Sequence, residues 1–150
     1  MERSQLALLF WTALVFWVLG QIWFVQIVIY PLFAQVGETE YAAYHRFYSR
    51  RIPLPVIIPG FASFLLPVAL WIAGPSVPHW MTAGNIGTGV VGLLVTVLRE
   101  IPRHARLETD GKNAAIIAEL VRFNWPRTLS ISAQSVIALL MLMHVFGHAR

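Results

Sequence analysis

Long apolar stretches separated by short charged segments dominate the hydrophobic pattern of this chain of 150 residues. Three stretches contain no Asp, Glu, Lys or Arg: residues 4–37, 52–98 and 128–149. A helix that crosses a bilayer needs about 20 apolar residues, so the first and last stretches each hold one span. The middle stretch has room for two spans, divided by the breaker cluster Gly-Pro-Ser-Val-Pro at residues 74–78. The pattern therefore predicts four membrane-spanning helices, at about residues 5–31, 53–73, 81–100 and 126–146.

Two connecting segments show helical spacing of their own. Residues 38–51 (ETEYAAYHRFYSRR) carry aromatic residues three and four apart, with arginines among them, which is typical of a short helix lying at the membrane interface. Residues 113–124 follow a turn at Asp110-Gly111, and Asn113 is suited to cap a helix there. The predicted fold is an all-α integral membrane four-helix bundle with two short interfacial helices, forming a single membrane domain over residues 1–150.

Prolines are predicted to mark several helix boundaries. Pro31 closes the first helix, and Pro102 disfavours helical structure at the residue before it and turns the chain there. Pro126 opens the last helix, at a position where proline is tolerated. Because the second span carries several prolines, it is predicted to be kinked or to begin late.

Small residues recur within the third predicted span. Its segment GTGVVG, residues 87–92, matches a dinucleotide-binding fingerprint, but no strand precedes it and it lies inside an apolar span, so that interpretation is excluded. Gly84, Thr88 and Gly92 repeat every four residues, the pattern that lets helices approach closely in lipid. We predict tight helix packing along this face, extending to a homo-oligomer or to a partner in a membrane complex.

The basic residues are distributed unevenly along the chain, which has a net charge of +4. Nine of its eleven Lys and Arg residues follow the first or third span, and only Arg3 and Arg150 lie on the other side. The positive-inside rule then places both connectors in the cytoplasm and both termini outside. Membrane topology thus accounts for the basicity, and we expect no nucleic-acid partner. The chain has no cysteine, so disulfides and thiolate ligands are excluded.

The reactive side chains gather in the same two connectors. His45 lies in the first, Glu100 and His104 lie at the end of the third span, and Asn124 and Arg127 precede the fourth. Glu100 and His104 are four residues apart and share a face if the helix continues. In one interpretation Arg99, Glu100, Arg103 and Arg106 form ordinary ion pairs at the interface, with His104 facing the headgroups. In the other two they form a site.

The first kind of site contains a metal ion. His45, Glu100 and His104 together supply two imidazoles and one carboxylate, the ligand set of non-haem iron or of a catalytic zinc with open positions. The second kind is a metal-free pocket. There a histidine serves as base or acid near neutral pH, while Asn124 and Arg127 orient a substrate oxygen.

Three short stretches carry a resemblance to known membrane proteins: YHRFYSRRI from residue 44, REIPRHARL from residue 99 and LVRFNWPRT from residue 120. They are similar to small bacterial four-helix membrane proteins of the anthrone oxygenase-like group, most of which have no assigned function. The resemblance implies a bundle in the bacterial inner membrane and, for a minority of members, oxygenation of a polycyclic phenolic compound without a well-defined cofactor. Carried over to this chain, it points to six residues: His45, Pro102, His104, Asn124, Trp125 and Arg127. Enzymes of the group often have a small polar residue where His104 stands.

Two functions are therefore expected. The first is an oxidoreductase or oxygenase that acts on a lipophilic quinone-like or phenolic molecule at the cytoplasmic face, with a non-haem metal ion or no cofactor. Its catalytic residues would be His45, His104, Glu100, Asn124 and Arg127. Trp23, Tyr30 and Trp125 would bind the ring of this molecule, and the first two lie seven residues apart on one helix face. The alternative is a non-enzymatic membrane subunit that stabilises or assembles a larger complex.

Overall fold

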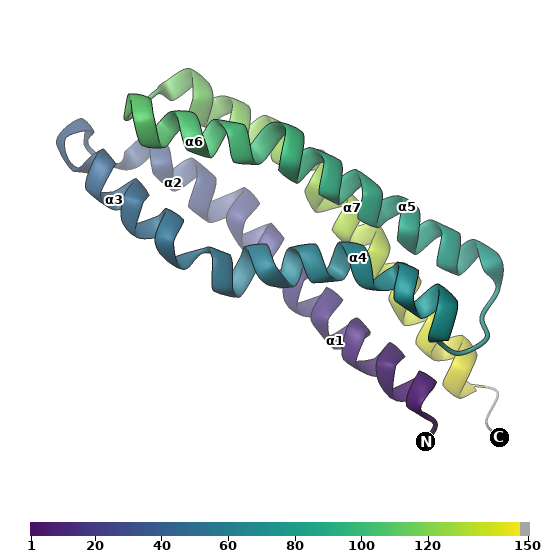
Figure 1. The fold of residues 1–150 in the computed structure, drawn as a ribbon. Coiled ribbons are helices and arrows are strands. Elements are labelled where there is room, and N and C mark those ends of the chain that lie inside the picture. Colours follow the sequence, from purple (N-terminus) through teal and green to yellow (C-terminus); the bar gives the residue numbers. More distant parts are fainter. Residues whose placement is uncertain (148–150) are drawn as a thin grey trace.

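The computed structural model describes residues 1–147, which form helices and no strand. The predicted outer-side residue Arg150 lies outside this range. Four rods of helix lie side by side in an elongated bundle (Figure 1). The rods consist in chain order of α1 (Arg3–Phe24), η1 (Val25–Ile29) and α2 (Tyr30–Gln35); α3 (Glu38–Arg51), η2 (Pro53–Ile57) and α4 (Ile58–Ala73); α5 (His79–Val95), η3 (Thr96–Glu100) and α6 (Ile101–Asp110); and α7 (Ala114–Gly147).

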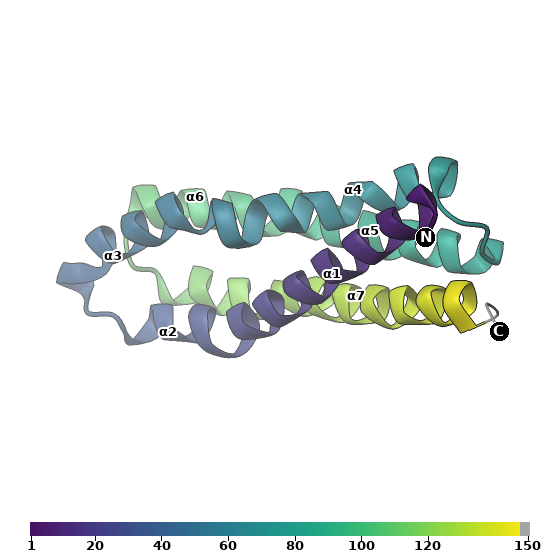
Figure 2. The same ribbon diagram turned by 90° about the horizontal axis from the view of Figure 1, so that it is seen from below.

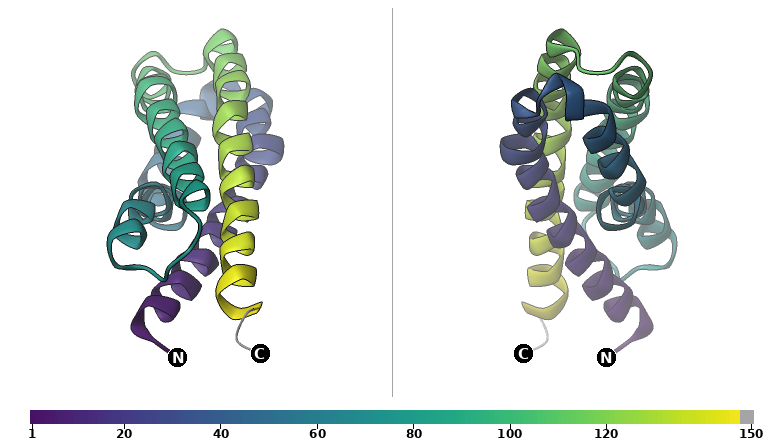
Figure 3. Two further views of the ribbon diagram at one scale, coloured as in Figure 1. Left: turned by 90° about the vertical axis from the view of Figure 1, so that its right-hand side faces the viewer. Right: turned by 90° about the vertical axis from the view of Figure 1, so that its left-hand side faces the viewer.

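Four helices are long and apolar enough to cross a membrane: Arg3–Gln35, Pro53–Ala73, His79–Asp110 and Ala114–Gly147. The chain is therefore an integral membrane protein, and the predicted all-α bundle is confirmed. Three of these helices have 32 to 34 residues, well beyond the roughly 20 that a bilayer core requires. Apart from Glu2 and Arg3, the charged residues of the described chain fall within residues 38–51 and 99–127. These segments lie toward the end of the bundle opposite the start of α1 and the end of α7 (Figure 3). We call this the distal end.

One of the two predicted interfacial helices is not a separate element. Residues 113–124 were expected to precede the last span, but α7 runs unbroken from Ala114 to Gly147. Its beginning is as predicted: α6 ends at Asp110, Gly111 adopts φ 79°, and the Asn113 side chain accepts hydrogen bonds from the next helix. The other segment forms α3 with the predicted bounds, and only Ile52 separates it from η2.

The first three rods each contain one π-helical turn, and each turn ends two residues before a proline, at Pro31, Pro59 or Pro102. The residue just before each proline donates its N–H to the carbonyl five residues back. Proline lacks an N–H, and its ring clashes with the carbonyl four residues back in a regular helix. The wider turn accommodates the ring, so the helix continues. Pro31 therefore does not close the first helix, and Pro102 does not turn the chain. Pro126 does not open the last helix either, because it lies inside α7.

The bundle is held together by α7, which packs against α1 and α5, while α4 packs against α5 and α1. α1 runs obliquely across the other rods (Figure 2). The small residues of α5 allow this close packing. A methyl group at Gly92 would collide with the Phe64 ring of α4, and one at Gly84 would press on Ile137 of α7. The predicted tight helix contact thus occurs between helices of the same chain.

Candidate functional site

Two histidines from distant parts of the sequence meet inside the distal end. The Nε2 atom of His45, on α3, lies 3.3 Å from Nδ1 of His104, on α6. The two rings are nearly parallel, with centroids 5.5 Å apart, and His45 is completely buried. The predicted convergence of the two connectors is therefore confirmed.

The histidine pair is the centre of a longer row of hydrogen-bonding groups. The Nε2 atom of His104 lies 3.1 Å from the Tyr30 hydroxyl of α2, and the Nδ1 atom of His45 lies 3.5 Å from the Ser49 hydroxyl. A neutral imidazole donates from one nitrogen and accepts at the other, and a hydroxyl does both. The row from Ser49 through both histidines to Tyr30 can therefore pass a proton in either direction. We call these four residues the relay.

Aromatic rings surround the relay on several sides. Tyr41 stacks on His45 and Tyr48 stacks on His104, with centroids 5.8 and 5.7 Å apart. The Phe33 ring meets both imidazoles edge-on. Burial lowers the pKa of His45, an effect that the charge of Glu108 partly offsets. His45 is consequently neutral at pH 7, the state in which it can accept a proton.

Glu100 and Arg127 are buried near the relay, on η3 and α7. They are 1% and 8% exposed, and no ion pair within 4 Å joins them in the part of the chain that the structure describes. Arg127 donates from Nη1 to the Thr96 hydroxyl at 3.2 Å. Within residues 1–147, no group meets the geometry of a hydrogen bond to either carboxylate oxygen of Glu100 or to Nε of Arg127, although the Tyr30 hydroxyl interacts with the Glu100 carboxylate. Two interior groups thus retain hydrogen-bonding capacity that the fold does not use.

Ordinary interfacial ion pairs do form, but among other residues. Arg103 binds Glu119 at 2.8 Å, and Arg106 lies 3.9 Å from Asp110. Glu100 and His104 point into the bundle instead, because the helix continues through Pro102 and keeps residues four apart on one face. The interfacial interpretation therefore holds for Arg103 and Arg106 and is wrong for Glu100 and His104. Arg99 lies over the Phe123 ring and forms no ion pair among the described residues.

Asn124 belongs to a separate amide network. Its Nδ2 donates to Oε1 of Gln26 at 2.8 Å, and Nε2 of Gln26 donates to the Val121 carbonyl at 3.0 Å. These contacts join η1 to α7 in the turn before Pro126. No hydrogen bond among the described residues connects Asn124 with His45 or His104. The structure therefore gives Asn124 a role in helix packing, and its predicted role at a substrate oxygen stays a prediction.

The predicted aromatic wall is divided between two places. Tyr30 faces the bundle interior, whereas Trp23 packs edge-to-face on Trp125 and donates to Ser132 of α7. Trp125 is 42% exposed. Residues seven apart share a face only in a regular α-helix, and η1 intervenes between Trp23 and Tyr30. One extra residue in a turn rotates the following side chains by about 100°, which separates Tyr30 from the two tryptophans.

The predicted metal ligands do not form a three-ligand cluster. Among residues 1–147 there is no group of three or more His, Cys, Asp or Glu side chains placed to hold a metal ion. His45 and His104 contact each other directly. The metal set of His45, Glu100 and His104 therefore has no preformed geometry in this structure.

Several site residues were not predicted from the sequence, although they lie one helical turn from residues that were. Tyr41 and Ser49 stand four residues before and after His45, and Thr96 stands four before Glu100. The pattern of residues 38–51 placed the tyrosines at the headgroups, but Tyr41 is completely buried. Side chains four apart share a helix face, so this spacing from His45 was the available signal. Phe33 had no comparable signal.

A groove with a volume of about 280 Å³ lies between the first two rods, next to the relay. Its lining is mostly apolar: Gln21, Phe24, Val25, Ile29, Tyr44, Phe47, Tyr48, Arg51, Ile52 and Pro55. Tyr48 both lines this groove and stacks on His104. An apolar molecule in the groove would therefore lie one ring away from the histidine pair.

Comparison of the chain with known protein families, curated proteins and solved structures finds no match. The fold and its site define the class of the protein as a helical integral membrane bundle with a histidine pair at one end.

Proposed function

We propose that this membrane protein binds a lipophilic phenolic or quinone-like molecule and exchanges a proton with its oxygen. This exchange is the acid–base step of an oxidoreductase or oxygenase reaction. The observation that carries the proposal is the relay, in which His45 and His104 bridge Ser49 and Tyr30 inside the bundle. Proton-conducting groups buried in a membrane protein are costly to maintain and commonly mark function.

The groove supports the choice of ligand. Its volume of about 280 Å³ is close to the lower limit for small-molecule sites, roughly 300 Å³. Its walls are apolar apart from a few polar groups, among them Tyr48 and Arg51. This combination suits a hydrophobic ring compound that arrives from the lipid and carries one or two oxygen atoms.

The relay supports the proton chemistry. His104 already contacts a phenol, the Tyr30 hydroxyl, so its nitrogen can exchange a proton with a hydroxyl of that kind. Both ring nitrogens of His104 are engaged, by His45 and by Tyr30, so the ligand proton would reach His104 through the Tyr30 hydroxyl, and His45 would pass a proton on toward Ser49. Oxidation of the deprotonated ring would then require an electron acceptor such as dioxygen or a second quinone.

We further propose that the distal end faces the cytoplasm of a bacterium, with the protein in the inner membrane and both termini outside. The uneven distribution of Lys and Arg supports this orientation. A role as a non-enzymatic subunit, and assembly as a homo-oligomer, stay predictions. The small residues that favoured them contact helices of the same chain.

The proposal is tested with 2-naphthol, whose absorbance distinguishes the neutral from the deprotonated form. Purified protein in lipid nanodiscs should bind 2-naphthol and raise its deprotonated fraction at pH 7.5, whereas His104→Gln should bind it without this change. His79→Gln is the matched control, because His79 is exposed and begins α5 at the opposite end. The proposal fails if wild-type protein does not bind 2-naphthol, or if His104→Gln gives the wild-type spectrum.

A further inference from the structure

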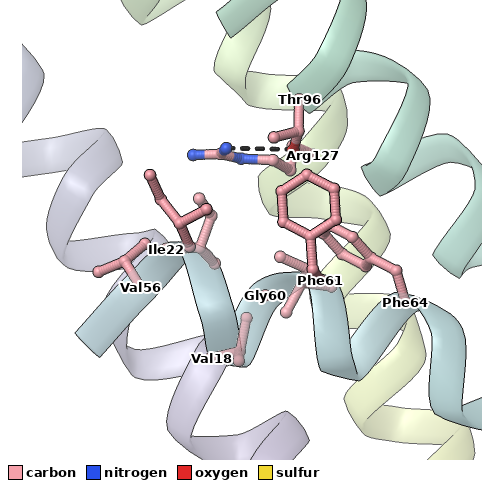
Figure 4. Close-up of a pocket in the computed structure, with 10 residues that line it drawn as sticks. Val18, Ile22, Val56, Gly60, Phe61, Phe64, Thr96 and Arg127 are labelled. Carbon is pink, nitrogen blue, oxygen red and sulfur yellow. Dashed lines mark hydrogen bonds between the residues drawn. The ribbon is translucent and has the colours of Figure 1, made fainter. Parts of the chain in front are cut away.

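Arg127 projects into a small pocket enclosed by α1, α4, η2, η3 and α7 (Figure 4). The pocket volume is about 30 Å³. Only Arg127 and Thr96 give it polar walls, and the dashed line in Figure 4 marks the hydrogen bond between them. The other lining residues are apolar: Val18, Ile22, Val56, Ile57, Gly60, Phe61, Phe64 and Ile131.

Among residues 1–147, no carboxylate forms an ion pair with Arg127. The residue is 8% exposed, and its Nε has no hydrogen-bond partner within residues 1–147. Glu100 interacts with it electrostatically but does not form an ion pair with it. Burying a charge without hydrogen bonds and a close partner is strongly unfavourable. The site is therefore built to receive an acceptor atom that carries negative charge.

We propose that Arg127, held in place by Thr96, binds the phenolate or carbonyl oxygen of the lipophilic ligand, while the apolar walls contact the adjoining edge of its ring. The Thr96 hydroxyl accepts from Arg127 and donates to the Gly92 carbonyl, so the guanidinium supplies the donors. This inference rests on the proposed function and adds to it the group that recognises the ligand oxygen. The guanidinium stabilises the oxyanion that remains once the proton has passed to the relay. Arg127 thereby favours the deprotonated form, and His104 takes the proton.

The size of the pocket restricts what it binds. A volume of about 30 Å³ holds roughly two water-sized atoms, so an oxygen and its ring carbon fit, whereas a whole ring does not. The body of the ligand must lie elsewhere, and the neighbouring groove provides the space. Ile22 and Val56 line the pocket, and their chain neighbours Gln21 and Pro55 line the groove.

Gly60 sets the space available beside the guanidinium. It is buried and lines the pocket, and a methyl group added there would meet no atom within 4 Å. Gly60→Ala therefore fills ligand space without colliding with the protein. Because alanine also favours helix over glycine, this variant should fold at least as well as wild type.

The test compares 2-naphthol with naphthalene, which has the same ring system without the oxygen. Wild-type protein in nanodiscs should bind 2-naphthol more tightly than naphthalene, after correction for partition into empty nanodiscs. Arg127→Gln should weaken 2-naphthol binding roughly 10- to 100-fold, as expected for loss of a hydrogen bond to a charged group, and leave naphthalene binding unchanged. Thr96→Val, which removes the partner of Arg127 at constant shape, should weaken 2-naphthol binding less. Gly60→Ala should weaken 2-naphthol binding about tenfold, as overfilling of a packed site does, with no loss of thermal stability.

Arg122→Gln is the matched control, since it removes the same charge from the same helix at an exposed position. The inference is overturned if Arg127→Gln and Gly60→Ala bind 2-naphthol as wild type does, even when the His104 test succeeds. A second result also overturns the inference: replacing gluconate in the buffer with chloride raises the melting temperature of wild type but not of Arg127→Gln, and wild type binds 2-naphthol no more tightly than naphthalene. The pocket would then bind a free anion. Failure of wild type to bind either ring compound instead counts against the proposed function, and this inference falls with it.

Discussion

The imidazoles of His45 and His104 lie in direct contact, with 3.3 Å between Nε2 and Nδ1, although 59 positions separate the residues along the chain. Their contact joins α3 to α6 and places two titratable groups side by side in a region enclosed by aromatic rings. Adding a proton to either ring puts a positive charge in that enclosed region, so this pair links the charge state of the protein to its packing.

This linkage predicts that acid destabilises the protein through His45. Because burial lowers the pKa of His45, the unfolded chain binds a proton below about pH 6.5 that the folded protein does not. Stability is therefore at its full value above that pH and decreases as the pH falls toward the lowered pKa of the folded state. The melting temperature in detergent should fall between pH 7.5 and pH 5, and His45→Gln should reduce the fall. An unchanged slope in the variant would assign no part of the fall to His45.

Two glycines of α5 should respond in opposite ways to alanine. Gly92→Ala places a methyl group against the Phe64 ring and should destabilise the protein by about 1–3 kcal/mol, the usual cost of overpacking. Gly87→Ala meets open space and should be neutral or slightly stabilising, by up to about 1 kcal/mol from helix propensity. Thermal unfolding followed by circular dichroism distinguishes them. Equal melting temperatures would show that α4 and α5 do not approach each other this closely.

The π turn η3 predicts an unusual effect of removing a proline. Pro102→Ala restores a backbone N–H and relieves the need for the wide turn at Thr96–Glu100. Return to a regular helix would rotate the residues beyond the turn by about 100° and move His104 away from His45. We expect near-wild-type helix content together with loss of the 2-naphthol spectral change. Retention of that change would mean that the π turn persists without the proline.

Trp23 should affect stability rather than ligand binding. Its indole N–H donates to the Ser132 hydroxyl at 3.1 Å, and loss of one such bond costs about 0.5–1.5 kcal/mol. Trp23→Phe should lower the melting temperature slightly and leave the affinity for 2-naphthol unchanged. Tyr48→Leu is the informative comparison, because Tyr48 lines the groove and stacks on His104. A marked loss of binding in Trp23→Phe would instead support the sequence-based assignment of Trp23 to the ring site.

The proposed orientation predicts the labelling of single cysteines, which can be introduced without background because the chain has none. Thr109→Cys, at an exposed position near the end of α6, should react with a membrane-impermeant maleimide only after the inner membrane is opened. Ser76→Cys, in the connection between α4 and α5, should react in intact spheroplasts. The reverse result would place the distal end outside the cytoplasm.

Hydropathy along the chain was enough to predict the membrane bundle, the break at residues 74–78 and the connector that contains Gly111. These features depend on composition over a window or on a local turn, and neither requires knowledge of distant contacts. The meeting of His45 with His104 was also predictable, since an even number of crossings returns the chain to the same side.

Only the tertiary structure decided which way the individual side chains face. A proline can end a helix, kink it or widen one turn, and the outcome depends on what packs around it. Here each of three helices contains one widened, π-helical turn. The widened turn between Trp23 and Tyr30 directs Tyr30 toward His104 and leaves Trp23 against α7. The sequence by itself specified the helices and the end of the bundle where the polar groups collect. Their assembly into one row required the rotation that a single extra residue per turn imposes, and periodicity along the chain does not record that rotation.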